Sequence, residues 1–385
     1  MNAMLNQKQL AMMQGAASFA VDHLDGIAAE LDRSGVYPKT LVAQLAANGM
    51  LGILLPEVWG GADLGFSTYI EVVRALSRGS PAVASILNHH ILAAAAIDQW
   101  GSDAQRAATL QALAKGERLA AFALGETGPA IGLGTDALIA TRKSGGFTLT
   151  GRKSFVRNAG VADVYLIFAT LAEPTGPSGL VAFIVEAATP GMTVGPRMET
   201  MGLNGCPVAD LIFKGASVGD DAVLHDLSAG SAIAERLLYL GALAEAAQTV
   251  GIAQVAARHA AEYAKHRVQF HHPIARQEAV QTMLAEIATD THLAWLGVQR
   301  AAQLVDNGEP FEVDAAMVKA FLARVGQKIL IDSCQVEGGL GISETAPKGV
   351  REALPLARLF RDIAGTTLLD APADFPERLI AASLA

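Results

Sequence analysis

The sequence predicts an α+β protein with an N-terminal helical domain, a small antiparallel β-barrel or sandwich in the middle, and a C-terminal four-helix bundle. Three observations predict this class. Apolar residues follow a helical period up to about residue 115, short apolar runs separated by glycine and proline occupy the middle, and long helical patterns return near residue 231. We therefore expect domains at residues 1–118, 119–230 and 231–385 of the 385-residue chain.

The first zone contains helical patterns interrupted by a loop. A helical period runs over residues 5–31, and Trp59-Gly60-Gly61 predicts a loop further along. A helical pattern of apolar residues then covers residues 67–100, where Pro81 is suited to the first turn of a helix. Ser102 predicts the N-cap of a further helix, because its hydroxyl can accept a hydrogen bond from a free backbone N–H group.

The second zone has the texture of short strands. Polar and apolar residues alternate over Phe147–Thr150, and short apolar runs cover Val164–Thr170 and Leu180–Val185. Pairs such as Gly145-Gly146 and Pro190-Gly191 separate these runs as turns. Short strands at roughly even spacing are typical of a small antiparallel barrel or sandwich.

The third zone predicts long helices over Ser231–His266, Gln277–Asn307 and Val313–Glu337. Gly308 follows the second helix at a position typical of a helix C-cap. The first helix contains the apolar run 237–257, but Glu245 lies inside it, and a central carboxylate costs about 2.5–3.5 kcal/mol in a membrane. We therefore predict a buried bundle helix and no membrane span.

Composition excludes several classes of function. The formal net charge is −9 and no block of Lys and Arg occurs, which argues against nucleic acid as a partner. The hydrophobic share of 51% and charged share of 17% exclude a disordered chain. The first residues lack the apolar run of a secretory signal, and Cys206 and Cys334 are the only cysteines, so we expect a cytoplasmic protein without a disulfide framework.

Several functional motifs are absent or lack their context. No Gly-x-Gly-x-x-Gly turn follows a strand and no P-loop occurs, which disfavours a nicotinamide Rossmann domain and a P-loop NTPase. Gly215–Gly219 has the spacing of a hydrolase nucleophile elbow without the strand–turn–helix context. The adjacent pairs His89-His90 and His271-His272 do not share a helix face, which disfavours a metal site. Arg267, at the end of a long helix, fits either a C-terminal cap or a phosphate ligand.

Six motifs follow one another along the chain. They are Leu55-Pro56-Glu57-Val58-Trp59-Gly60-Gly61, Gly101–Arg106, Met201–Gly205, Arg267-Val268-Gln269-Phe270, Gln335–Gly341 and Arg361-Asp362. In this order, and over nearly the whole chain, they resemble the motifs of the acyl-CoA dehydrogenase family. Six ordered matches are far more specific than any one of them.

The resemblance implies an FAD enzyme, usually a homotetramer or a dimer of dimers. It implies that an α-proton is removed from an acyl-CoA or acyl-carrier thioester while the β-hydrogen leaves as hydride to flavin N5, and that an electron-transfer protein accepts the electrons. The cofactor contacts that it implies within one subunit are Leu124, Thr135, Phe155 and Arg157. The contacts that it implies from a neighbouring subunit are Arg267, Phe270, Gln335, Gly338 and Gly339.

The resemblance also implies a catalytic base. Counted from Arg361-Asp362, the family's catalytic Glu falls on Asp370, a carboxylate that is one methylene shorter. A base must reach the thioester α-carbon in a dry site, and a deficit of about 1 Å can cost about a hundredfold in rate. The alternative is that Asp370, before Ala371-Pro372, is a solvated turn residue or a helix cap.

The departures from the family cluster at the flavin. Arg157 stands where the family has a Thr that usually bonds flavin N5, so its cation lies there or points elsewhere. A second base position known in the family falls near Gly241, which has no carboxylate, and Glu245 one turn further along is a candidate substitute. Two alternatives therefore stay open: a non-catalytic structural subunit of a heteromeric acyl-CoA dehydrogenase, and a flavin oxidase or monooxygenase on the same fold.

Overall fold

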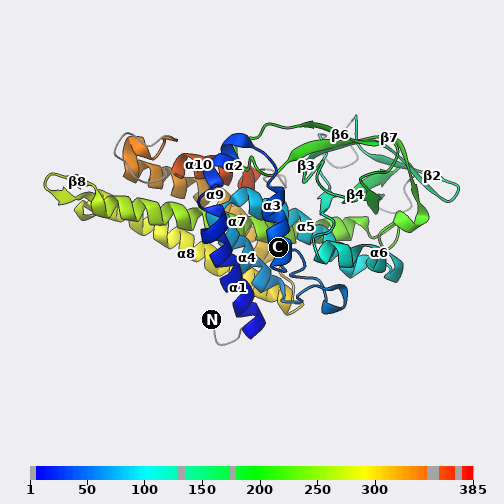
Figure 1. Ribbon diagram of the computed structural model, residues 1–385, viewed down its shortest axis with the longest axis horizontal. Helices are drawn as coiled ribbons and strands as arrows, with labels where there is room; N and C mark the ends of the chain where they lie inside the picture. Colours follow the sequence, from blue (N-terminus) through cyan, green and yellow to red (C-terminus); the bar gives the residue numbers. More distant parts are fainter. Residues whose placement is uncertain (1–5, 128–134, 174–178, 345–354, 369–374, 385) are drawn as a thin grey trace.

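The computed structural model describes residues 6–127, 135–173, 179–344, 355–368 and 375–384. Its elements follow the order helical, β, helical, which confirms the predicted fold class. The helices of the first and last parts pack together at one end of the long axis and in the centre, and the sheet lies at the other end (Figure 1). Within the described residues, none of the helices is long and apolar enough to cross a membrane.

The N-terminal helices surround a common apolar core. They are α1 (Gln7–Phe19), α2 (Ala28–Ser34), α3 (Lys39–Ala47), α4 (Phe66–Gly79), α5 (Pro81–Trp100) and α6 (Asp103–Ala114). Pro81 starts α5, and Ser80 caps it by accepting a hydrogen bond from the Val83 backbone N–H. Ser102 caps α6, as predicted, in a reciprocal pair with Gln105. The single helix expected over residues 5–31 is wrong, because a π-helical turn (Ala20–Leu24) and a turn separate α1 from α2.

The middle part is one curled seven-stranded sheet. Its strands are β1 (Ala120–Ala123), β2 (Ile139–Lys143), β3 (Gly146–Arg157), β4 (Val164–Leu171), β5 (Leu180–Glu186), β6 (Met192–Arg197) and β7 (Val208–Gly219). The expectation of a purely antiparallel sheet is wrong, because β4 pairs in parallel with both β1 and β2. Gly215–Gly219 lies inside β7, so it forms no nucleophile elbow.

The C-terminal helices pack along one another. They are α7 (Gly230–His266), α8 (Glu278–Asp306), α9 (Glu312–Glu337), α10 (Leu356–Leu368) and α11 (Phe375–Leu384). The 37-residue α7 contacts α4, α5, α8, α9 and α10, so it joins the two helical parts. A short hairpin of β8 (Val268–Gln269) and β9 (His272–Pro273) follows α7 at the end of the molecule away from the sheet (Figure 1).

His90 ties the N-terminal helices to the sheet. It is fully buried on α5, and its Nδ1 accepts a hydrogen bond of 3.0 Å from the backbone N–H of Ala120 at the start of β1. Its neighbour His89 stacks on Phe122, with ring centroids 4.8 Å apart, so the two rings serve separate packing contacts. Burial lowers the pKa of His90 to about 4, because the charged imidazolium cannot be hydrated there.

We expect this histidine to make the fold acid-sensitive. Its pKa is about 4 in the folded protein and near 6.5 in the unfolded chain, so between these values the unfolded chain binds more protons. The free energy of unfolding should therefore fall as the pH drops from 6.5 to 4, by up to about 3 kcal/mol from this group. Urea denaturation of His90→Gln should show a shallower pH dependence, whereas the exposed control His292→Asn should keep the wild-type dependence.

Candidate functional site

Strand β3 carries two of the predicted cofactor residues, Phe155 and Arg157, whose side chains differ in exposure. The pairing of β3 with β7 shifts its register between Lys153 and Val156, which is a β-bulge. Phe155 lies in this bulge with a φ of 57°, and half of its surface is exposed. Arg157 follows and is turned inward, with an exposed fraction of only 2%. A left-handed backbone at a bulky residue is costly, and such strain is concentrated at functional sites.

The other two predicted contacts of this group lie on either side of residues 128–134, which are outside the described part of the chain. Leu124 is buried just after β1, and its carbonyl accepts a hydrogen bond of 3.0 Å from Lys153 Nζ. Thr135 is exposed, where the described part of the chain resumes. Leu124 and Phe155 are thus brought to one edge of the sheet, since Ser154 N donates to the carbonyl of Gly125.

A buried ion pair that the sequence analysis missed holds this edge. Lys153 Nζ lies 2.6 Å from Glu126 Oε1, and their side chains are 0% and 2% exposed. Glu126 Oε1 also accepts a hydrogen bond of 3.1 Å from the Leu138 backbone N–H. Burial lowers the pKa of Lys153 to about 8, and the carboxylate of Glu126 opposes this shift. The sequence alone did not indicate this pair, because Lys153 lies 27 residues after Glu126.

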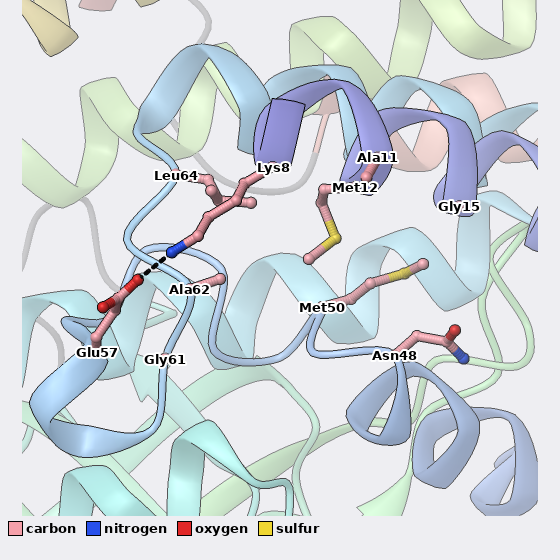
Figure 2. A pocket seen from close by; sticks show the side chains of 10 residues that line it. All are labelled: Lys8, Ala11, Met12, Gly15, Asn48, Met50, Glu57, Gly61, Ala62 and Leu64. Atoms are coloured by element: carbon pink, nitrogen blue, oxygen red, sulfur yellow. Dashed lines mark hydrogen bonds and ion pairs between the residues drawn. The ribbon is translucent and has the colours of Figure 1, made fainter. Parts of the chain in front are cut away.

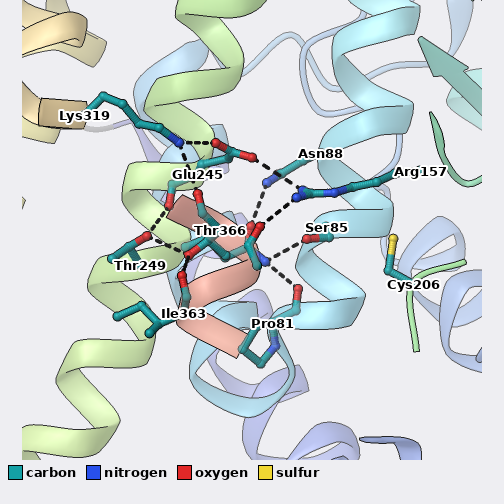
Figure 3. Close-up of polar contacts among 12 residues, drawn as sticks. Pro81, Ser85, Asn88, Arg157, Cys206, Glu245, Thr249, Lys319, Ile363 and Thr366 are labelled. Carbon is teal, nitrogen blue, oxygen red and sulfur yellow. Dashed lines mark hydrogen bonds and ion pairs between the residues drawn. The ribbon is translucent and has the colours of Figure 1, made fainter. Parts of the chain in front are cut away.

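Arg157 joins a charged cluster inside the molecule, shown in Figure 3. Its Nη1 lies 3.5 Å from Glu245 Oε1 of α7, and Glu245 Oε2 accepts a hydrogen bond from Lys319 Nζ of α9. Arg157 Nη2 also donates to the carbonyl of Gly365 in α10 at 2.9 Å. Glu245, considered from the sequence as a substitute base, therefore shares one interior site with Arg157, and two cations bind its carboxylate. The predicted contact between Arg157 and flavin stays a prediction.

Neutral polar side chains extend the interior around this cluster. Tyr69 Oη donates to Asn88 Oδ1 at 2.9 Å, and burial raises the pKa of Tyr69 well above its usual value. Asn88 Nδ2 lies 3.4 Å from Gln248 Oε1, and Gln248 Nε2 donates to Ser85 Oγ at 2.9 Å. The helices α4, α5 and α7 therefore meet through hydrogen bonds as well as apolar packing in this region.

The second group of predicted contacts lies far from the first group in the same chain. Arg267 and Phe270 belong to the hairpin after α7, at the opposite end of the molecule from the sheet (Figure 1). Phe270 has an exposed fraction of 85% and a φ of 52°. One chain alone therefore does not bring Phe270 to Phe155, which agrees with the expected role of a neighbouring subunit.

Gln335, Gly338 and Gly339 lie together along one cavity. The cavity has a volume of about 600 Å³ and is also lined by Arg361 of α10. Gly338 ends α9 with φ 63° and ψ −134°, a conformation that favours glycine. A side chain at Gly338 or Gly339 would meet open space, so the glycines leave backbone groups accessible to a ligand.

The motif Leu55–Gly61 lines a different cavity, shown in Figure 2. This cavity has a volume of about 470 Å³ between α1 and the loop after α3, and Met12, Met50 and Leu64 form much of its apolar wall. Lys8 Nζ and Glu57 Oε1 pair at 2.5 Å beside it. The motif is therefore separate from the charged cluster around Glu245.

The predicted base Asp370 lies outside the described residues. Helix α10 ends at Leu368, two positions earlier, and the description resumes at Phe375. The structure thus places the helix that leads to Asp370 and not its carboxylate.

Two sets of described residues, at opposite ends of the molecule, offer groups of the kinds that a flavin dinucleotide needs (Figure 1). Phe155 offers an exposed aromatic ring, and next to it the buried Ser154 Oγ has no hydrogen-bond partner among the residues described. Arg267 supplies a guanidinium of the kind that binds pyrophosphate, and the backbone around Gly338-Gly339 is open to a ligand. A stacking surface, a free hydroxyl, a cation and an open backbone are the groups that an isoalloxazine ring and a pyrophosphate need.

Comparisons with known proteins cover the whole fold. Family profiles for the N-terminal, middle and C-terminal domains of acyl-CoA dehydrogenases match residues 6–117, 121–216 and 228–385. An acyl-CoA dehydrogenase of Bacillus subtilis is 34% identical, with 95% of each chain covered, and a 3-(aryl)acrylate reductase of Clostridium sporogenes is 32% identical, with 96% of each covered. The structure of butyryl-CoA dehydrogenase from Megasphaera elsdenii superposes with a TM-score of 0.92 at 31% identity, over 99% of this chain and 98% of that one.

Proposed function

The chain belongs to the acyl-CoA dehydrogenase family and is an FAD-dependent oxidoreductase, and we propose that it oxidises an acyl thioester between Cα and Cβ, with Asp370 as the base. The observation that carries this proposal is the match to all three domains of the family in order. The edge of the sheet at Phe155 adds support, because its exposed ring and the free hydroxyl beside it suit a flavin.

The proposed reaction is an α,β-desaturation. The carboxylate of Asp370 takes the α-proton of the thioester, the β-hydrogen leaves with its electron pair, and a Cα=Cβ double bond remains. When bound, FAD supplies the acceptor for that hydride. In one subunit Leu124, Thr135 and Phe155 would hold the cofactor, and Arg157 would do so through its backbone, because its guanidinium is bound to Glu245 and to the Gly365 carbonyl. Asp370 is one methylene shorter than the family's Glu, so its reach to the α-carbon would depend on the distance between its backbone and the substrate.

The proposal includes a partner subunit and a partner protein. Phe270 and Val268 expose apolar surface on the hairpin, with exposed fractions of 85% and 53%, which suits a contact with a second subunit. That subunit would supply Arg267, Phe270, Gln335, Gly338 and Gly339 to the cofactor of its neighbour, in a homo- or hetero-oligomer. An electron-transfer protein would reoxidise the cofactor in the cytoplasm, where Cys206 and Cys334 stay as free thiols.

A visible spectrum of the purified chain tests the proposal. We expect bound flavin that bleaches under anaerobic conditions with an acyl-CoA. The first probe is butyryl-CoA, which the name of one relative contains, and the second is 3-phenylpropanoyl-CoA, an aryl-substituted acyl thioester. Bound flavin that stays oxidised with a panel of acyl-CoA and acyl-carrier thioesters would refute the dehydrogenase.

Two other functions give different results in the same experiment. A colourless chain that gains flavin and activity only with a related partner chain would identify a non-catalytic structural subunit. Release of hydrogen peroxide during turnover in air would identify an oxidase on the same fold, and transfer of an oxygen atom from O₂ to the product would identify a monooxygenase.

We expect Arg267→Ala to weaken FAD binding about 10- to 100-fold, because a charged hydrogen bond to phosphate contributes about 1.5–3 kcal/mol. Titration of the apoprotein with FAD, followed by flavin fluorescence, measures the change. The control is Arg276→Ala, an exposed guanidinium in the turn just beyond the same hairpin, which should bind FAD like the wild type. Full FAD occupancy in Arg267→Ala would remove this residue from the proposed site.

A further inference from the structure

Three segments distant in sequence meet at the charged cluster of Arg157, Glu245 and Lys319. Arg157 comes from β3, Glu245 from α7 and Lys319 from α9, and their exposed fractions are 2%, 4% and 9%. Two cations and one carboxylate are thus withdrawn from water at the junction of the sheet and the helices (Figure 3). A buried charge cluster of this kind is at best a weak source of stability, because desolvation offsets the attraction. Net stabilisation of the fold therefore does not explain why these three charges are buried together.

Both cations of the cluster bind the end of α10. Arg157 Nη2 donates to the carbonyl of Gly365 at 2.9 Å, and Lys319 Nζ donates to the carbonyl of Thr366 at 3.1 Å. These carbonyls belong to the last turn of α10 that the structure describes, and each accepts a hydrogen bond from a cation there. Thr249 of α7 adds a hydroxyl contact of 3.0 Å to Thr366 Oγ1.

We propose that Arg157, Glu245 and Lys319 form a clamp that fixes the end of α10 against β3, and that all three are positioning residues for the flavin reaction. Glu245 holds the two cations at the spacing of two successive carbonyls, so the clamp needs all three charges. The clamp is close in sequence to two proposed site residues. Phe155 lies two residues before Arg157, and Asp370 lies four residues after Thr366. The inference rests on the proposed function, because only then do both neighbours belong to one reaction site.

The first measurement asks whether the clamp holds α10. In Lys319→Met, amide hydrogen exchange in peptides that cover residues 356–368 should become at least about tenfold faster, because the helix end loses a charged anchor. Lys319→Arg retains the charge and should restore slow exchange. The control is Lys328→Met, on the same helix α9, which breaks an exposed pair with Glu286 and Asp332 and should leave α10 unchanged. Wild-type exchange of α10 in Lys319→Met would overturn the clamp.

The second measurement asks whether the clamp positions the reaction. In FAD-loaded Lys319→Met, the rate constant for flavin reduction by an acyl-CoA should fall about 10- to 100-fold, whereas KM and the FAD dissociation constant should change less than about threefold. Lys319→Arg should recover most of the rate. If exchange in α10 accelerates while the reduction rate stays at the wild-type value, the positioning role is wrong.

Two further outcomes separate the inference from the proposed function. If Lys319→Met does not fold, the double variant Glu245→Gln/Lys319→Met replaces it, because this variant removes two opposite charges together. Fast amide exchange in α10 of the double variant would support the clamp, and slow exchange would overturn it. If the wild-type flavin is not reduced by any acyl thioester, the proposed function fails and the positioning role fails with it. The exchange measurement uses no substrate, so it still decides whether the clamp exists.

Discussion

Replacing Asp370 by asparagine should slow reduction of the bound flavin by an acyl thioester about 10²- to 10⁴-fold, which is the usual contribution of a general base. The amide cannot take up the α-proton, while its shape and size stay close to those of the carboxylic acid. Binding of FAD and the denaturation midpoint should therefore change little. Anaerobic stopped-flow absorbance with an acyl-CoA measures the rate constant directly.

Asp374→Asn is the matched control for this experiment. It makes the same chemical change four residues further along the segment between α10 and α11. Its reduction rate should equal that of the wild type if the effect belongs to Asp370. Equal rates for Asp370→Asn and the wild type would remove Asp370 as the base, and Glu245 would not replace it easily, because Arg157 and Lys319 already occupy that carboxylate.

Asp370→Glu tests how the shorter side chain is accommodated. If the backbone has not moved toward the substrate, the added methylene restores the reach of the family's glutamate and the rate rises. If the backbone has already adapted, the longer side chain overpacks the site and the rate falls. The sign of the change therefore reports the distance between the backbone and the thioester.

Local sequence signals predicted the elements that depend on local physics. Pro81 at the start of α5 and Ser102 before α6 were readable because a missing N–H and a capping hydroxyl act within one turn of helix. The π-helical turn at Ala20–Leu24 was not readable, since residues 5–31 keep an apolar periodicity through it. The parallel partners of β4 were also missed, because alternation within a strand does not encode which strand lies beside it.

In the candidate site, too, residues within local motifs could be predicted from the sequence, and residues placed by tertiary contacts could not. Motif order led to Arg267, Phe270 and Gly338, whose residue types can be compared with the family directly. The direction of Arg157 depends on a bulge in β3, and a bulge is set by the pairing with β7 rather than by the segment itself. Lys319 gave no signal at all, because its partner Glu245 lies 74 residues away in the sequence.

Replacing Lys153 by methionine should destabilise the fold by about 3–5 kcal/mol, the usual cost of leaving a buried carboxylate without its partner. Lys153 is fully buried, and the side chain of Glu126 is only 2% exposed, so water cannot replace the ammonium group beside this carboxylate. The double variant Lys153→Met/Glu126→Gln removes both charges and should recover much of the loss. Urea denaturation of the wild type, Lys153→Met and the double variant measures the free energy of unfolding of each.

The pair of Lys8 and Glu57 provides the contrast that isolates burial. Its atoms approach as closely, at 2.5 Å, but the two side chains are 71% and 65% exposed. Water and salt screen such a pair, so Lys8→Met should leave the denaturation midpoint unchanged. Equal effects of Lys153→Met and Lys8→Met would mean that burial does not decide the cost. A large loss confined to Lys153→Met, recovered in the double variant, would show that the charge of Glu126, and not the lost packing of the lysine chain, governs the stability of the sheet edge.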